Sequence, residues 1–232
     1  MTQTDNKTKI VKADGKSVVM VIEDINNLDF FFPIDGSLLQ DVQPANKETH
    51  KWTLIEIFEK CGNNYELWDE PDEGLYIYDA SSAEINPMCK TGMTKAELTG
   101  NVLYVGSLDH IELEVLYNSY SCRHMRKNML MSEQDYIFAV EEIGGELVIS
   151  PKILEPINKK YTPEELTNLC GGSKYIGTHL PVIVPGVVKM MVHTETADEK
   201  NDYLNTPASV VARKAIYGPA AMISIKHLDN II

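Results

Sequence analysis

Apolar positions are densest between residues 180 and 192, and we expect the fold to form around this run. Residues 182–184 and 187–192 are rich in β-branched side chains without helical spacing, which predicts two strands that meet at Pro185-Gly186. Both faces of the second strand are mostly apolar, as in a strand that is covered on two sides. The run is too short to span a bilayer as a helix, which takes roughly 20 residues.

Turn and capping signals divide the rest of the chain into short elements. Strands are predicted over residues 8–13, 16–23, 30–32, 75–78, 101–105, 111–118, 146–150 and 220–226. Helices are predicted over residues 49–61, 94–100, 132–143, 162–171 and 208–217. Strands and helices do not alternate regularly, so we expect an α+β fold, with mainly antiparallel sheets and about five short helices packed on them.

Three of these assignments depend on specific local signals. The helix over residues 132–143 follows from Ser132 as its cap, acidic residues in its first turn and Gly144-Gly145 as its end. The helix over residues 94–100 follows from a threonine and a glutamate at capping-box spacing. The strand over residues 111–118 follows from apolar residues that alternate with glutamates, which predicts one buried face and one wet face.

No repeat, low-complexity block or change in composition marks a domain boundary, so we expect a single domain over residues 1–232. Residues 150–161 contain Pro151, Pro156 and two adjacent lysines, which makes them the candidate hinge. Residues 1–7 are polar and are predicted to form an N-terminal arm.

The chain is acidic, with 232 residues and a formal net charge of −13. This charge argues against general affinity for nucleic acid or anionic lipid, because polyanions repel it. No secretory signal or membrane span is found in the sequence. We therefore expect a soluble protein in the cytoplasm, or in a particle assembled there.

No metal or cofactor site is predicted. The four cysteines are scattered without a C-x-x-C pair, and the six histidines form no H-x-x-x-H pair, so free thiols are favoured over zinc ligands. One acidic cluster has ligands suited to calcium, but its spacing matches no calcium loop, and a solvated surface turn is the favoured interpretation. The cluster consists of Asp69, Glu70, Asp72 and Glu73.

Residues 122–127 form the one concentrated basic patch of this acidic chain. The patch is a candidate site for a phosphate or another anion, since cationic side chains hold such groups. An ordinary solvated turn with surface ion pairs is the favoured interpretation of this patch. The candidate ligand-binding residues are Arg123, His124, Arg126 and Lys127.

No nucleophile elbow, zinc-protease motif, dinucleotide-binding glycine motif or Walker lysine occurs in the sequence, and no catalytic residue is assigned. The chain also ends in Ile231 and Ile232, an apolar terminus that suits a covered interface. We therefore expect a non-enzymatic structural subunit of a larger homo-oligomeric assembly. Chain length and composition suit a viral or phage particle component, such as a connector ring or capsid accessory protein.

The alternative hypothesis is a small enzyme or binding protein for a phosphorylated or anionic ligand. It would use Arg123, His124 and Arg126. A concave pocket around residues 122–127 would favour this ligand hypothesis, whereas a flat apolar patch would favour assembly.

Overall fold

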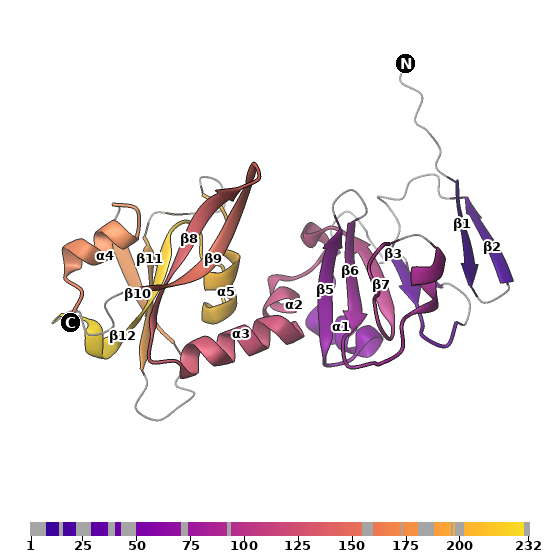
Figure 1. Ribbon diagram of the computed structural model, residues 1–232, viewed down its shortest axis with the longest axis horizontal. Helices are drawn as coiled ribbons and strands as arrows, with labels where there is room; N and C mark the ends of the chain where they lie inside the picture. Colours follow the sequence, from indigo (N-terminus) through magenta and orange to yellow (C-terminus); the bar gives the residue numbers. More distant parts are fainter. Residues whose placement is uncertain are drawn as a thin grey trace, which may run out of the picture. The chain divides into compact units, whose positions relative to one another are not determined.

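The fold is described from a computed structural model of the chain, drawn in Figure 1. The structure describes residues 8–13, 16–21, 29–36, 40–42, 50–70, 74–91, 94–154, 160–172, 174–180, 188–195, 197 and 202–229. The chain divides into two compact units, residues 1–121 and residues 122–232. Each unit is described by itself below, and the prediction of one domain with a hinge at residues 150–161 stays a prediction.

Unit 1 contains a hairpin and a five-stranded antiparallel sheet. The hairpin pairs β1 (Thr8–Ala13) with β2 (Lys16–Val21), where the sequence predicts two strands. The sheet has the strand order β4-β3-β7-β6-β5. Its strands are β3 (Asp29–Phe32), β4 (Gln40–Val42), β5 (Tyr65–Glu70), β6 (Gly74–Asp79) and β7 (Val102–Gly106).

Apolar clusters cover both faces of this sheet. Successive residues of β7 show this, since they belong alternately to one cluster and to the other. Val102 and Tyr104 pack with the region around the 3-10 helix η2 (Pro87–Thr91). Leu103 and Val105 pack with helix α1 (Leu54–Cys61) and helix α2 (Leu113–Tyr117). A short 3-10 helix, η3 (Leu108–His110), precedes α2.

Helix α1 begins where the sequence supplies a cap. The hydroxyl of Thr53 accepts from the backbone N–H of Glu56, and the Glu56 carboxylate accepts from the backbone N–H of Thr53. This reciprocal capping box satisfies two amides that would otherwise lack partners. The predicted helix over residues 49–61 is therefore confirmed over residues 54–61.

Unit 2 contains a second five-stranded antiparallel sheet, with the strand order β10-β11-β12-β8-β9. Its strands are β8 (Asp135–Ile143), β9 (Glu146–Leu154), β10 (Tyr175–His179), β11 (Lys189–Thr194) and β12 (Ala220–Ser224). Helices α3 (Tyr120–Met131) and α5 (Thr206–Ala212) contribute to the cluster on one face. Helix α4 (Pro163–Leu169) contributes to the cluster on the other, and η4 (Ile225–His227) follows β12.

Five of the six residues of strand β11 are buried and Met190 is half-buried, which confirms that the densest apolar run of the sequence forms a strand covered on two sides. It lies second in the sheet, next to the central strand β12. The first predicted strand of that run and the Pro185-Gly186 corner lie outside the described residues.

The longest element of unit 2 is the hairpin formed by β8 and β9. Only residues 136–138 of β8 pair with β12, whereas the nine residues of β8 pair with β9 along their full length. Among the described residues, the distal part of the hairpin therefore pairs only with itself, and Figure 1 shows it extending past the other strands of its sheet. Gly144 and Gly145 make the two-residue turn, with φ angles of 65° and 93°.

The structure confirms the α+β class, with antiparallel sheets and five α-helices in its described part. Three local predictions are wrong. Residues 135–143 form strand β8 instead of a helix, and residues 113–117 form helix α2 instead of a strand. Residues 94–100 form no helix, because the Thr94 hydroxyl accepts from the N–H of Ala96 within a turn.

No helix in the part of the chain that the structure describes is both long and apolar enough to cross a membrane.

Candidate functional site

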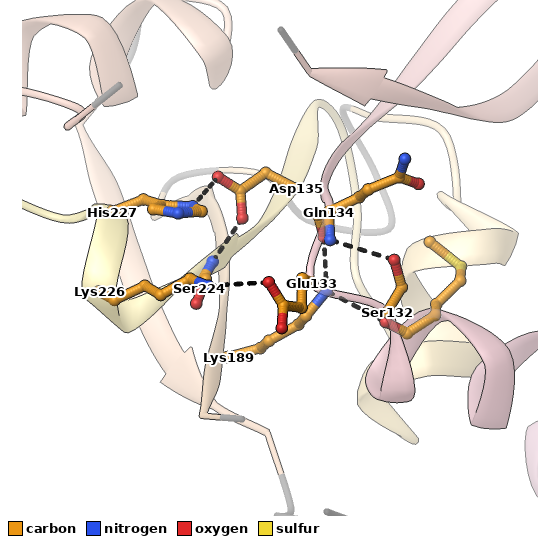
Figure 2. A network of polar contacts seen from close by, with 9 residues as sticks. Ser132, Glu133, Gln134, Asp135, Lys189, Ser224, Lys226 and His227 are labelled. Carbon is orange, nitrogen blue, oxygen red and sulfur yellow. Dashed lines mark hydrogen bonds and ion pairs between the residues drawn. The ribbon is translucent and has the colours of Figure 1, made fainter. Parts of the chain in front are cut away.

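A buried carboxylate lies at the root of the β8–β9 hairpin (Figure 2). Asp135, the first residue of β8, has an exposed fraction of 0%. One of its oxygens accepts from the backbone N–H of Ser224 at 2.7 Å, and the other accepts from Nδ1 of His227 at 2.7 Å. These hydrogen bonds join the start of the hairpin to the end of β12 and to η4.

A buried lysine lies in the same region of Figure 2. Lys189 is 2% exposed, and its Nζ donates to the carbonyl oxygens of Met129 at 3.1 Å and Gln134 at 2.5 Å. The ammonium also lies 5.3 Å from the centre of the Tyr136 ring. Burial lowers the pKa of Lys189 to about 8, although the charge of Asp135 acts in the opposite direction.

Together, the side chains of Asp135 and Lys189 connect the root of the hairpin to neighbouring elements of unit 2. The contacts of Asp135 reach β12 and η4, and those of Lys189 join β11 to the end of α3 and the residue before β8. The Asp135–His227 pair has the composition of an acid-base dyad, but both side chains are buried and serve hydrogen bonds inside the unit. The arrangement is suited to fixing where the hairpin leaves the sheet.

A groove of about 530 Å³ runs beside the distal part of the hairpin. Val140, Val148 and Ile149 line it from β8 and β9. Tyr203, Leu204 and Pro207 line it from the start of α5 and the segment before it. The lining is mostly apolar, which is typical of surfaces that bind another apolar group.

Exposed aliphatic side chains accompany this groove. Ile143, next to the hairpin turn, is 58% exposed, and Val148 is 38% exposed. Ile153, near the root of β9, is 48% exposed and is not among the residues that line the groove.

Strand β9 is also an edge of the sheet, and it carries Pro151 and Lys152, residues that oppose pairing with a further strand. Contact through side chains is therefore favoured here over extension of the sheet.

The predicted ligand-binding residues all lie on helix α3. His124 and Lys127 are exposed, and Arg123 and Arg126 are half-buried. The Nε of Arg126 donates to the carbonyl oxygen of Val211 in α5 at 3.0 Å. Burial and, secondarily, the charge of Arg213 lower the pKa of Arg126.

Arg213 was absent from the predicted set, because it is far from residues 122–127 in the sequence. Residues 122–127 form part of helix α3 instead of the predicted turn, and their role in ligand binding stays a prediction.

The other candidate residues do not form a site in the described part of the chain. Asp69 is an exposed residue of β5. The structure does not describe the other candidates, which are the side chain of Glu70, Asp72, Glu73, Ile231 and Ile232. No group of three or more His, Cys, Asp or Glu side chains among the described residues is arranged to hold a metal ion. None of the four cysteines, all of which the structure describes, forms a disulfide, and burial raises the pKa of the Cys61 and Cys170 thiols to about 12.

Comparisons with protein-family models, curated proteins and solved structures found no match for this chain. The argument for function therefore depends on the surfaces and side chains of the molecule.

Proposed function

We propose that this chain is a non-enzymatic structural subunit of a larger homo-oligomeric assembly, and that the β8–β9 hairpin makes the contact between copies. One observation carries the proposal. The distal part of the hairpin combines an apolar groove of about 530 Å³ with exposed aliphatic side chains. Water contact with such a combination is unfavourable, and burial against a partner removes it.

A second copy of the chain is the partner that the hairpin favours. The exposed aliphatic side chain of Ile143 is called the knob below, and the groove lined by Val148 is an apolar depression that suits such a side chain. The knob stays exposed within its own chain, so the groove that receives it belongs to another copy. A contact between two different surfaces of the same molecule is head-to-tail, and it closes into a ring or continues as a filament.

The buried polar groups at the hairpin root support this use. Asp135 and Lys189 fix β8 relative to β11, β12 and η4. A contact surface on an element held in one position loses less conformational freedom on binding than one on a mobile loop. These contacts therefore fix the root of the hairpin, which supports a defined position for a subunit contact.

The assembly class stays a prediction from chain length and composition: a viral or phage particle component, such as a connector ring or capsid accessory protein. The same applies to the cytoplasm, or a particle made there, as its location.

The proposal is tested by measuring the native mass of purified protein at micromolar concentration with light scattering. We expect a multiple of the single-chain mass for the wild type. Val148→Asp places a charge in the groove, and Ile143→Asp places a charge on the knob, so we expect each variant to be a monomer.

Ile153→Asp is the matched control. It changes an exposed aliphatic residue of the same strand outside the groove, and we expect it to keep the wild-type mass. A monomeric wild type would contradict the proposal, and an equal loss of mass in all three variants would contradict the assignment of the contact to the groove.

A further inference from the structure

The arginines of this chain are few and unevenly placed. The sequence contains three arginines and 18 lysines, so lysine supplies nearly all of its positive charge. All three arginines belong to unit 2, where Arg123 and Arg126 lie one helical turn apart on α3 and Arg213 directly follows α5. Arginine differs from lysine in presenting a planar fork of donors that matches phosphate and carboxylate oxygens.

The fold brings two of these arginines together from distant parts of the sequence. The hydrogen bond from Arg126 Nε to the Val211 carbonyl, 3.0 Å long, places the Arg126 guanidinium at the last turn of α5. Arg213 follows Val211 by two residues, and its charge contributes to lowering the pKa of Arg126. The Arg126 guanidinium therefore lies at the same helix end at which Arg213 is the C-cap residue.

No carboxylate in the described part of the chain neutralises these two positive charges. Among the described residues, Arg126 and Arg213 take part in no ion pair. Acidic side chains are abundant in a chain with a net charge of −13, yet none of the described ones is paired here. Two adjacent cations repel each other, and a bound anion would relieve that repulsion.

The backbone of Arg213 gives a second, independent indication. Arg213 has a φ of 54° and a ψ of 39°, and among the described residues every other positive φ belongs to a glycine. Glycine is the usual residue in this conformation at the end of a helix, because a side chain strains it. An arginine retained in a strained position is typical of a residue whose side chain has a function.

Capping of α5 explains only part of this arrangement. The Arg126 Nε–H satisfies one of the terminal carbonyl groups that a helix leaves without partners. The negative end of the α5 dipole favours cations at this helix end, but neither it nor capping explains why an arginine occupies a position that suits glycine. The terminal nitrogens of Arg126, which form the fork, have no hydrogen bond to any described residue.

We propose that Arg126 and Arg213 form a binding site for a single phosphate group, carried as inorganic phosphate or as the phosphomonoester of a small compound. The two guanidinium groups donate to different oxygens of the same dianion, and their own repulsion falls when it binds. A long polyanion such as nucleic acid is disfavoured, because the rest of the chain repels it. This site is independent of the contact proposed for the hairpin.

The test is a calorimetric titration of the full chain with inorganic phosphate and with phenyl phosphate at constant ionic strength. We expect saturable binding to the wild type and about a tenfold loss of affinity in Arg213→Gln, since one of two charge-assisted contacts is removed. Arg213→Lys keeps the charge but loses the fork, so its affinity should fall between the two. Arg213 is exposed, so these changes leave the core intact.

Lys127→Gln is the matched control, because it removes one exposed positive charge from α3 without touching the arginine pair. We expect its affinity to stay within about twofold of the wild type, as for a distant screened charge. Tighter binding of phenyl phosphate identifies an ester as the ligand, and tighter binding of inorganic phosphate identifies the free ion. Equal affinity in Arg213→Gln and the wild type, or equal losses in Arg213→Gln and Lys127→Gln, would overturn the proposal.

Discussion

The two units share a plan, a five-stranded antiparallel sheet with an apolar cluster on each face, but they differ in what they bury. Among the described Asp, Glu, Lys and His side chains, Asp29 is the buried one in unit 1, and it accepts a hydrogen bond from the Trp52 indole at 2.8 Å. Unit 2 buries four such side chains: Asp135, Lys189, His193 and His227.

The difference shows two ways of using a buried polar group. In unit 1, the Asn86 amide ties its loop to the sheet by donating to the carbonyls of Phe32 at 2.8 Å and Gly100 at 2.6 Å. Burying a neutral amide that keeps its hydrogen bonds costs less desolvation free energy than burying a charged group. In unit 2, charged groups meet at the root of a projecting hairpin, and buried charges add less to stability than apolar packing would. Their placement therefore favours a role in fixing the hairpin.

Removing the carboxylate of Asp135 should have the largest effect. Asp135→Ala leaves the Ser224 amide and the His227 ring without their shared acceptor, so we expect a loss of about 3–5 kcal/mol in the free energy of unfolding of unit 2. Hydrogen exchange of the β12 amides at increasing urea concentration measures this loss within unit 2.

Asp29→Ala in unit 1 provides the comparison. It deprives the Trp52 indole, a neutral donor, of its acceptor, so we expect a smaller loss of about 1–3 kcal/mol. Tryptophan fluorescence follows this unfolding, because both tryptophans belong to unit 1. Equal losses in the two variants would contradict the distinction between the units.

The second prediction concerns pH. The pKa of Lys189 is about 8 in the folded protein, against 10.5 for an ordinary lysine, so the unfolded chain binds more protons between these values. The free energy of unfolding therefore rises with pH from about 8 to 10.5, and the cost of burying the charge is fully present below pH 8. Relative to Lys189→Met, the wild type should gain about 3 kcal/mol across this interval, since one pKa unit corresponds to about 1.4 kcal/mol.

Urea unfolding of both proteins at several pH values checks this expectation. Lys127→Met is the control, because Lys127 is exposed and its charge does not contribute to the shift in the pKa of Lys189, so its loss should leave the pH dependence unchanged. A difference between wild type and Lys189→Met that stays constant with pH would show that the ammonium titrates normally.

The third prediction compares glycines in the two sheets. A Cβ on Gly74 of unit 1 would lie 2.8 Å from the Gly106 carbonyl oxygen and 2.8 Å from the Tyr104 hydroxyl, at a φ of 101°. Gly74→Ala should cost about 2–3 kcal/mol, since the backbone oxygen cannot move aside cheaply. Gly177→Ala in unit 2 meets the flexible side chain of Met190 and should cost under about 1 kcal/mol. Thermal unfolding ranks the two, and the reverse order would contradict this account.

The smallest expected effect is a gain in stability. In unit 1 every described residue with a positive φ is a glycine, whereas in unit 2 Arg213 adopts a φ of 54°. Arg213→Gly should stabilise unit 2 by about 0.5–1 kcal/mol, because the strain of the side chain disappears. The melting temperature measures the gain. A lower melting temperature would show that the arginine contributes to folding instead of to binding.

Much of the fold follows from local signals that the structure uses as the sequence presents them. Thr53 with Glu56, and Thr162 with Glu165, form the capping boxes that begin α1 and α4. Pro207 stands in the first turn of α5. These interactions lie within a few residues of each other, so no knowledge of the tertiary structure is needed to find them.

The hairpin was missed because its apolar spacing fits two structures. Tyr136, Val140 and Ile143 lie on one face of a helix, but Tyr136, Phe138 and Val140 also alternate as in a strand. Gly144-Gly145 ends a helix equally well or turns a hairpin. Pairing with β9 and β12 decides the outcome, and such contacts are not visible in a local window.

The candidate sites were predicted only in part, for the same reason. Arg126 is visible in the basic patch, but its partner Arg213 and its acceptor Val211 are far away in the sequence. The scarcity of arginine is the signal by which the pair is recognisable. The polar contacts at the hairpin root join β8, β11, β12 and η4, so they emerge only when the sheet forms.

Mixing two monomeric variants is the most direct test of the proposed assembly contact. Ile143→Asp lacks the knob but keeps the groove, and Val148→Asp keeps the knob but has a charged groove. An equimolar mixture contains one intact knob and one intact groove per pair, so native mass spectrometry should show a heterodimer, while each variant alone stays monomeric. A mixture that contains only monomers, from a wild type that assembles, would contradict head-to-tail contact through this hairpin.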